Sequence, residues 1–483
     1  MIKRSTDATD HVWALLGGDP ALTAAVGLGG PGPGGALRAR LPVREMARST
    51  VAVCALAAAE LAAARRGGGP LPAVRVDDGA VAAAFVSERH LRVGGRAATT
   101  FAPLSRFWRT ADGWVRTHAN YPHHRARLLA ALGQPDAGAG GDEALAGRVA
   151  DVLAGREAAQ VEEEIHAAGG LAVAVRTPHE WAVHPQGAAV AQRSLLSLER
   201  IGGGAVRRFG GHVGGLPAAG LRVLDLTRVI AGPVATRTLA LLGADVLRVD
   251  SPSLLESQDA HNDTGFGKRS TTLDLARAAD RATFDELLAT ADVVVTGYRP
   301  GALDRHGLSP QALAERRPGL VIGQLSAWGT YGPWGGRRGF DSLVQAACGI
   351  AAVEAGPDSR PGVLPAQALD HGTGYLLAAA VLRGVTDQRA GGGTYLARLA
   401  LAQTAAWLAR GVGRDETLRD VGECDVEPWM RERPGAFGPV RYVSSPVVFD
   451  GGPSDWACVA GRWGADAAVW GGAGGGAGPS GAA

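Results

Sequence analysis

The stretch RVLDLTRVIAGPVATRTLALLGADVLRVD, residues 222–250, decides the fold. Two short apolar runs flank a helix-forming run that has Pro233 near its first turn, where proline is tolerated. A buried strand, a helix and a second buried strand in this order indicate a parallel βαβ unit. Strand-like runs recur at residues 270–275, 291–298 and 319–329, with helices predicted over 279–290 and 309–316. We therefore expect an α/β fold with a doubly wound parallel sheet.

The first turn of this unit, LTRVIAGP at residues 226–233, has neither of the common phosphate-binding glycine patterns. It lacks the GxGxxG spacing of nicotinamide-binding domains, and the P-loop pattern is absent from the chain. Ligands of open α/β sheets bind beyond the carboxyl ends of the strands. A ligand is therefore expected at that edge of the sheet, but the turn does not favour a nicotinamide cofactor.

Composition excludes several classes of partner and site. Of 483 residues, 46% are hydrophobic and 20% charged, and the net charge of +2 implies no general attraction to nucleic acid or acidic membranes. The four cysteines have no CxxC spacing, so we expect neither a disulfide framework nor a metal site. The N-terminus is polar, and apolar runs such as VAVCALAAAELAAA, residues 51–64, are too short to span a bilayer. A cytoplasmic protein without membrane contact is expected.

The sequence upstream of residue 221 has a different pattern of predicted helices and strands. Residues 100–200 are predicted to form a small α+β unit, in which Asp112-Gly113 between aromatic-rich runs indicates a β-hairpin. Helices are expected around residues 144–154 and 156–168. A glycine-rich linker, residues 201–220, joins this unit to an α/β domain over 221–410. The tail, residues 471–483, lacks apolar anchors and is expected to be disordered.

An internal repeat links the two halves of the chain. LPVREMARSTVAVCALAAAELAAARR, residues 41–66, aligns without gaps with LPAQALDHGTGYLLAAAVLRGVTDQR, residues 364–389. The Leu-Pro start, a threonine, the alanine run and a final arginine coincide, whereas Ala47 stands opposite Asp370. Alanine-rich helices resemble one another by chance as well as by descent, and the sequence leaves both origins open.

Asp370 stands directly ahead of the second of these predicted helices. Aspartate commonly caps a helix N-terminus, and it also serves as a metal ligand or a catalytic group. From this residue alone a cap is the simplest interpretation. If the repeat is real, however, the helix also forms in a copy that has alanine at this place, which favours a chemical role for Asp370.

Four stretches of the chain, in order, carry a family resemblance. They are residues 222–252, GKRSTTLDL at 267–275, ADVVVTGYRPGALDRHGL at 291–308 and RRGFDSLVQAACGI at 337–350. Together they resemble the family III CoA-transferases, the formyl-CoA and carnitine-CoA transferase group that also includes the α-methylacyl-CoA racemases. The resemblance implies a Rossmann-like CoA-binding large domain with a smaller α+β domain. It also implies acyl-CoA as a substrate, a carboxylic acid as its partner and no prosthetic group.

The order of the domains departs from the family pattern. Residues 100–200 resemble the family's small domain, which there follows the large domain rather than preceding it. Residues 411–470 resemble the end of a second, shortened small domain. A tandem duplication with complementary losses accounts for this order, with residues 1–99 as a degenerate part of the first large-domain copy. Because family members form interlocked dimers, we expect a homodimer or an intrachain pseudo-dimer.

Asp370 falls where the family carries its catalytic aspartate. The resemblance implies that this carboxylate attacks the acyl-CoA thioester to form an aspartyl anhydride, and that CoA then forms an aspartyl-CoA thioester. Gly372 and Gly374 would let backbone N–H groups approach the substrate closely. Phe340 occupies the place where the racemase branch has a histidine, so it is expected to pack on the substrate rather than move a proton.

The resemblance also implies a set of CoA contacts, because arginine and lysine bind phosphate through charge-assisted hydrogen bonds. The chain has only two lysines, Lys3 and Lys268, and the second stands at the family's lysine position. The expected CoA-binding residues are Arg228, Val229, Ile230, Ala231, Lys268, Gly297, Tyr298, Arg299, Arg305 and Arg338.

Two other functions remain open from the sequence. An acyl-CoA racemase or isomerase would need a second acid/base group, such as His371 or His306, facing Asp370 across the substrate. A catalytically silent CoA-binding partner protein is suggested by the altered domain order and by Ala47 in the first copy. The leading hypothesis is a CoA-transferase, and the acyl donor and acceptor are not specified by the sequence.

Overall fold

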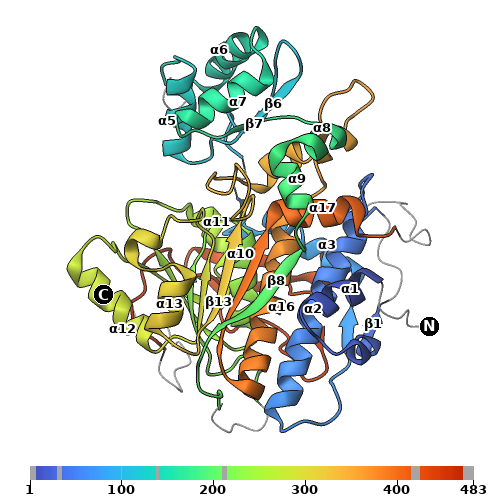
Figure 1. Ribbon diagram of the computed structural model, residues 1–483, viewed down its shortest axis with the longest axis vertical. Coiled ribbons are helices and arrows are strands. Elements are labelled where there is room, and N and C mark those ends of the chain that lie inside the picture. The colour runs from blue at the N-terminus through green and yellow to red at the C-terminus, as the bar shows by residue number, and fades with distance from the viewer. Residues whose placement is uncertain are drawn as a thin grey trace.

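The structure, a computed structural model, describes residues 7–29, 35–98, 101–136, 141–208, 215–414 and 425–471. Its main element is a seven-stranded sheet with the order β11-β10-β9-β12-β13-β14-β8 (Figure 1). The first six strands in this order pair in parallel, and β8 pairs antiparallel with β14. The parallel strands are β9 (Arg222–Leu226), β10 (Asp245–Asp250), β11 (Lys268–Thr272), β12 (Val293–Thr296), β13 (Val321–Ser326) and β14 (Thr394–Ala400). The chain therefore has a mixed α/β fold with a largely parallel sheet, as predicted.

Helices cover both faces of this sheet. Alternate strand residues point to opposite faces, and both sets are buried. Val223 and Val321 pack in one hydrophobic cluster with α10 (Ala231–Leu241), α16 (Ala368–Gly391) and α2 (Val43–Arg65). Leu224 and Ile322 pack in a second cluster with α12 (Ala278–Ala289) and α13 (Pro310–Arg316). Burial on both faces explains why these strands read as nearly continuous apolar runs.

The edge strand β8 (Leu196–Gly202) was not expected from the sequence. Residues 196–200 were assigned to the small α+β unit, and 201–220 to a linker. Instead β8 pairs along the length of β14, from Leu196 opposite Leu399 to Gly202 opposite Thr394. The large sheet thus begins before residue 221. Of the predicted linker, residues 209–214 lie outside the described residues.

Helices α2 and α16 lie side by side and run in the same direction. Gly372 lies against Met46 and Thr50, Arg383 pairs with Glu60 at 2.5 Å, and Arg389 donates to the carbonyl oxygen of Ala64 at 2.7 Å. In the ungapped repeat alignment, position 60 corresponds to 383 and position 49 to 372. The alignment therefore matches residues that are spatial neighbours, as expected if two copies of one helix pack about a local two-fold axis.

Residues 101–174 form the upper lobe of Figure 1, with its own hydrophobic core, and the helices that follow pack against the body. A three-stranded sheet, β5 (Phe107–Arg109), β6 (Trp114–Thr117) and β7 (Ala172–Ala174), is antiparallel throughout. Its helices are α5 (Pro122–Ala131), α6 (Asp142–Ala154) and α7 (Ala158–Ala167), followed by α8 (Pro178–Val183) and α9 (Pro185–Ala191). The hairpin at Asp112-Gly113 and the two predicted helices α6 and α7 are confirmed.

The C-terminal segment joins the first copy to the large sheet. Strands β15 (Met430–Gly435) and β16 (Gly438–Val443) form a sheet with β3 (Arg92–Val93) and β4 (Arg96–Ala97), and β17 (Val448–Phe449) pairs with β2 (Val74–Val76). Trp463 Nε1 then donates to Asp250 Oδ2 at 2.9 Å. Of the tail predicted to be disordered, residues 472–483 lie outside the described residues.

Helix α2 is long and apolar enough to cross a membrane, so the length argument made from the sequence was wrong. It has 23 residues, and 94% of its most apolar window is buried inside the molecule. Burial rather than length is therefore what identifies α2 as a core helix, and no other helix among the described residues passes the same test of length and composition.

Candidate active site

A cavity of about 560 Å³ opens where the parallel strands of the large sheet end. The cavity is lined by one residue at, or directly after, the carboxyl end of each of the six parallel strands. These residues are Leu226, Asp250, Leu273, Gly297, Ser326 and Leu401. This is where ligands of open α/β sheets bind, and a volume of this size suits an organic ligand. Because β9 has β10 on one side and β12 on the other, the strand order reverses at this point.

Asp370 lines this cavity from the first turn of α16. Its side chain does not cap the helix, because the N-cap residue is Gln367 and no side chain makes a capping hydrogen bond. The capping interpretation of Asp370 is therefore wrong. With 6% of its surface exposed, the residue reaches the cavity from an otherwise enclosed position.

The N-terminal turn of α16 is held by a second buried carboxylate. Asp341, at the start of α14 (Asp341–Ala347), accepts a hydrogen bond from the backbone N–H of Asp370 at 3.0 Å. The side-chain amide of Gln345, one turn further along α14, donates to Asp341. Its side-chain oxygen accepts a hydrogen bond from the backbone N–H of Leu364 at 2.8 Å. These contacts connect α14 to Leu364, ahead of α16, and to Asp370, in the first turn of α16, and so they fix the position of Asp370.

Both carboxyls titrate above their ordinary range. Burial raises the pKa of Asp341 to about 6, although hydrogen bonds to its carboxylate oppose the rise. The pKa of Asp370 is raised well above its ordinary value by burial, and further by the negative charges of Asp341 and Glu88. Such a carboxyl is more basic than an exposed one when ionised, which suits a nucleophile or a proton acceptor.

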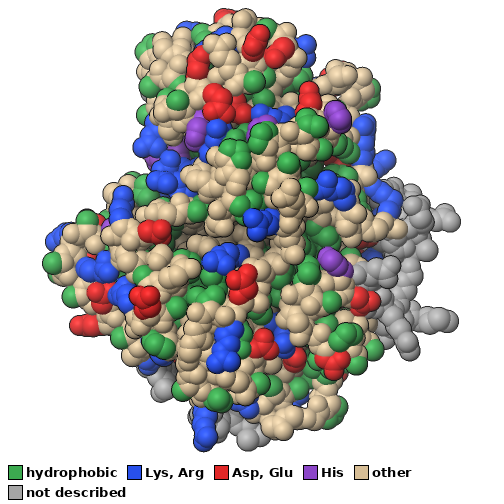
Figure 2. Space-filling view, viewed as in Figure 1, with side chains coloured by type: hydrophobic (Ala, Val, Ile, Leu, Met, Phe, Trp, Pro, Cys, Tyr) green, Lys and Arg blue, Asp and Glu red, His purple; other side chains and the backbone are tan. Residues whose placement is uncertain are grey.

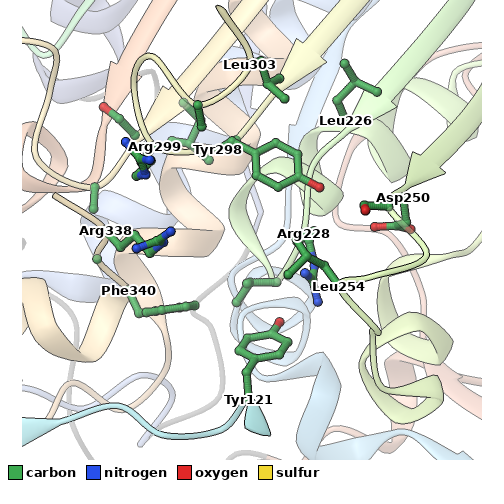
Figure 3. Close-up of a pocket in the computed structure, with 18 of the residues that line it drawn as sticks. Tyr121, Leu226, Arg228, Asp250, Leu254, Tyr298, Arg299, Leu303, Arg338 and Phe340 are labelled. Atoms are coloured by element: carbon green, nitrogen blue, oxygen red, sulfur yellow. The ribbon is translucent and has the colours of Figure 1, made fainter. Parts of the chain in front are cut away.

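Basic residues line the side of the cavity that lies opposite Asp250. Figure 3 shows Arg299 and Arg338 on one side and Asp250 on the other. Burial lowers the pKa of Arg338, and the positive charges of Arg299 and Arg127 lower it further. No carboxylate among the described residues pairs with Arg299 or Arg338. Unneutralised arginines around a cavity form a binding site for an anion such as a phosphate.

The turn after β9 presents its backbone to the cavity. Val229 has a φ of 70°, a conformation that costs a β-branched residue on the order of 1–3 kcal/mol. Arg228 donates to the carbonyl oxygen of Leu255 at 2.7 Å and lies 4.8 Å from the ring centre of Tyr121. Val229, Arg228 and Ala231 all line the cavity. Ile230 does not, and is the N-cap residue of α10.

Lys268 is placed beneath this turn and not in the cavity. Its ammonium group lies 3.0 Å from Asp225 Oδ2, 3.0 Å from the carbonyl oxygen of Pro233 and 2.6 Å from Thr236 Oγ1. Both charged side chains are fully buried, and burial lowers the pKa of Lys268 to about 8. The expected contact of Lys268 with CoA phosphates is corrected: this lysine braces the β9–α10 turn from inside.

Gly372 and Gly374 serve helix packing and do not line the cavity. A Cβ atom at Gly374 would lie 2.6 Å from the carbonyl oxygen of Ala231 and 2.9 Å from Val234, both on α10. A Cβ atom at Gly372 would meet Met46 at 3.4 Å, on α2. The expectation that these glycines open the backbone to substrate is therefore corrected: they let α10 and α2 approach α16.

The remaining predicted residues are brought together at the cavity. Gly297, Tyr298, Arg305 and Phe340 all line it. Phe340 stacks on His118 of the upper lobe, with ring centres 3.7 Å apart and planes 3° from parallel. An aromatic ring held in this way moves no proton. His306 lines the cavity as well, whereas His371 does not and faces the first copy.

The upper lobe supplies residues that sequence reasoning missed. Tyr121, His123, His124 and Arg127, at the start of α5, line the cavity. Tyr121 donates to Glu256 at 3.0 Å, which ties the lobe to the large domain. In Figure 2, basic and histidine side chains gather along the junction of the lobe with the body. The place of the two adjacent histidines at the cavity depends on how the two units pair.

Two more residues near Asp370, namely Asp341 and Glu88, were also missed. Asp341 directly follows Phe340 in the sequence motif, and that adjacency was the available signal. Glu88 lies 282 residues before Asp370 and carries no local signal at all. Among the described residues, no group of three or more His, Cys, Asp or Glu could hold a metal ion.

Comparisons with known proteins agree with one another. The family model of CoA-transferase family III matches residues 4–206 and, separately, residues 218–419, as two copies in one chain would. The chain is 35% identical over 206 residues to an acetyl-coenzyme A transferase of Hypoxylon pulicicidum, covering 41% of this chain and 34% of the relative. It is 33% identical over 208 residues to a probable fatty acyl-CoA transferase of Mycobacterium tuberculosis, covering 40% and 52%.

A crystal structure of the Mycobacterium tuberculosis protein is among the similar solved structures. It has a TM-score of 0.38 and 34% sequence identity, and the match covers 41% of this chain and 57% of that one. The chain thus matches about a third to a half of the length of these two curated relatives.

Proposed function

The chain belongs to CoA-transferase family III, and from this premise we propose that it moves CoA from an acyl-CoA to a carboxylic acid through covalent intermediates on Asp370. The observation that carries the proposal is the place of Asp370. It is a buried carboxylate with a raised pKa, and it lines the same cavity as arginines that no carboxylate among the described residues neutralises. A nucleophile and a phosphate-binding region thus share one ligand site.

The proposed first half of the reaction releases the donor acid. A carboxylate oxygen of Asp370 attacks the thioester carbonyl, the carbon–sulfur bond breaks and CoA leaves as a thiolate, which gives an acyl-aspartyl anhydride. The thiolate then attacks the aspartyl carbonyl of this anhydride. The donor leaves as a carboxylate, and Asp370 holds CoA as a thioester.

The second half runs the same steps toward the acceptor. The acceptor carboxylate attacks the aspartyl-CoA thioester, forming a second anhydride and releasing the thiolate again. The thiolate attacks the acceptor's carbonyl, the new acyl-CoA forms and the carboxylate of Asp370 is restored. No net proton transfer is needed, so residues such as Phe340 that cannot exchange protons fit beside the reacting atoms.

The arrangement of the fold supports this use of the cavity. We interpret the strand order as a doubly wound, Rossmann-like sheet, in which the β9 turn lies at the reversal of strand order. In the proposed complex Arg299, Arg305 and Arg338 bind the CoA phosphates, and the thioester reaches Asp370. CoA stays bound while the acyl group changes, so these contacts act in every step.

Racemisation is disfavoured by the same geometry. It needs acid/base groups on both faces of the α-carbon. Phe340 occupies the place of the racemase histidine and its ring has no exchangeable proton, and His371 does not line the cavity. The names of the relatives refer to acetyl-CoA and fatty acyl-CoA transfer, and we extend only the class, acyl-CoA with a carboxylic acid, to this chain.

The proposal is tested by acyl exchange with Asp370→Asn as the matched variant. The wild type is incubated with a panel of acyl-CoA donors and carboxylic acids, and new acyl-CoA species are measured by mass spectrometry. We expect exchange in the wild type and a loss of at least about 10³-fold in the variant, since the nucleophile is gone. CoA affinity, measured by calorimetry, should change little.

Exchange by Asp370→Asn at the wild-type rate would contradict the proposal. So would α-deuterium incorporation from deuterated water into a chiral 2-methylacyl-CoA without any exchange, because that result identifies a racemase. Tight CoA binding without exchange for any pair would instead identify a silent binding partner.

A further inference from the structure

A segment of the first copy packs behind the first turn of α16. Phe85 stacks on His371 with ring centres 5.3 Å apart, and on Tyr375 with ring centres 5.9 Å apart. These two partners lie one helical turn apart, so the segment covers one face of α16. Asp370 and His371 are neighbours in the chain, but Asp370 reaches the cavity whereas His371 reaches this segment.

Glu88 is the charged group of this segment. It lies in α4 (Ser87–His90), and its Oε2 atom is 3.5 Å from Nε2 of His371. The side chain of His371 is fully buried and that of Glu88 is 19% exposed. Burial raises the pKa of Glu88, but the close contact with His371 and the charge of Arg89 outweigh it and hold this pKa below its ordinary value. The pair is thus an interaction between the two copies.

The position of Glu88 is fixed by its neighbour Ser87. The hydroxyl of Ser87 lies 3.1 Å from Asp263 and 3.3 Å from Arg237, two side chains that pair with each other at 3.1 Å. Arg237 belongs to α10, which packs against α16 through Gly374. The segment therefore contacts two helices of the second copy just before Glu88, α16 through Phe85 and α10 through Ser87.

Five ionisable groups meet around this turn. Asp370 faces the charges of Asp341 and Glu88, and Glu88 faces His371 and Arg89. His371 also acts on Asp341, whose pKa it lowers. The first copy thus contributes one negative charge to a cluster whose balance determines how readily Asp370 ionises.

We propose that Glu88 is a positioning residue of the acyl-transfer site, which acts by holding His371 and thereby fixing the first turn of α16 and the carboxylate of Asp370. The inference rests on the proposed function of Asp370. It means that the first copy, which has lost its own carboxylate, completes the active site of the second.

The charge balance gives the direction of the expected effects. Glu88→Gln removes a negative charge that disfavours ionisation of Asp370, so the acid limb of the kcat/KM pH profile moves to lower pH. His371→Gln removes the partner of Glu88 and leaves its negative charge unpaired, so the limb moves to higher pH. Both variants lose the contact between Glu88 and His371 that holds the first turn of α16. We therefore expect kcat to fall about tenfold, while KM for acyl-CoA changes little.

Glu60→Gln is the matched control. Glu60 is also a first-copy carboxylate paired with a cationic side chain of α16, but its partner Arg383 lies about 18 Å along the helix from His371. All variants are made in the full chain, and their folding is checked by thermal denaturation and by CoA binding. Should Glu88→Gln fail to fold, Glu88→Asp and His371→Gln carry the test, with Glu88→Asp expected to keep the wild-type acid limb.

The expected result is a pair of opposite shifts for Glu88→Gln and His371→Gln, with Glu60→Gln unchanged. Wild-type kcat and pH profiles in both site variants would overturn the inference. A fall in kcat without any shift would also overturn it, because a structural contact alone produces that pattern. If instead the wild type shows no exchange at all, the proposed function fails and not this inference alone.

Discussion

The first turns of α16 and α2 begin alike and differ at the residues that carry charge. At the start of α16, Asp370 reaches the cavity and His371 pairs with Glu88. At the matching places of α2, Ala47 is fully buried and Arg48 pairs with Asp78 at 2.5 Å, also in the interior. Each of these places thus has a basic side chain paired with a carboxylate of the first copy, but only in α16 is the residue directly before it a carboxylate.

This difference separates what folding needs from what chemistry needs. Helix α2 begins at Val43 after Pro42, with no side-chain cap, and runs for 23 residues without an aspartate in its first turn. Since the helix forms there with alanine, Asp370 is not needed to start α16. Burying that carboxylate opposes folding, so its retention in one copy is best explained by reaction chemistry.

The largest effect is expected from giving α2 the missing carboxylate. Ala47→Asp buries a charge in a fully enclosed position, which we expect to lower the free energy of unfolding by about 3 kcal/mol or more. Urea denaturation measures the loss, with Ala47→Ser as the uncharged control at about 1 kcal/mol. A variant as stable as the wild type, with a second reactive aspartate, would mean that the two turns are chemically equivalent.

A smaller effect distinguishes the two glycines that follow Asp370. In Gly374→Ala the new methyl group meets backbone and Val234 of α10, and we expect a loss of about 2 kcal/mol. In Gly372→Ala it meets only the flexible end of Met46, so the gain in helix propensity, about 0.5–1 kcal/mol, should dominate. Thermal denaturation should therefore move Tm in opposite directions. Equal changes would show that α16 packs equally tightly on both neighbours.

A further small effect is a gain in stability on removing the proposed nucleophile, Asp370. Because the pKa of Asp370 is raised on folding, its contribution to stability is fully present below the pKa of the unfolded chain. It is lost as the pH rises through the folded-state pKa. Asp370→Asn should thus be more stable than the wild type by on the order of 1 kcal/mol at neutral pH, and the gap should close in acid. A variant less stable at every pH would show that the carboxylate supports the fold.

Local patterns predicted the sheet and the position of the cavity. The buried runs became β9 to β13, and the cavity lies at the carboxyl ends of these parallel strands, as expected; the family resemblance, rather than the pattern, named Arg228, Gly297, Arg299 and Phe340, which line it. The repeat predicted that α2 and α16 are equivalent, and their in-register packing agrees. These features depend on period and spacing, which a sequence displays directly.

The features that the sequence did not predict depend on pairing between distant segments. The edge strand β8, the lining by Tyr121 and the contact of Glu88 with His371 arise only when separate units dock. Lys268 stood at the expected position in the motif, but which way its side chain turned was decided by Asp225, 43 residues earlier. A motif gives the place of a residue in the chain and not the face to which it points.

The most direct test of the account is to trap the covalent intermediate. The full chain is incubated with acyl-CoA, treated with hydroxylamine and digested, and its peptides are analysed by mass spectrometry. The account predicts one hydroxamate per chain, on Asp370, absent from Asp370→Asn and from every peptide of the first copy. Active exchange with no modification at Asp370, or with the label on another carboxylate, would contradict it.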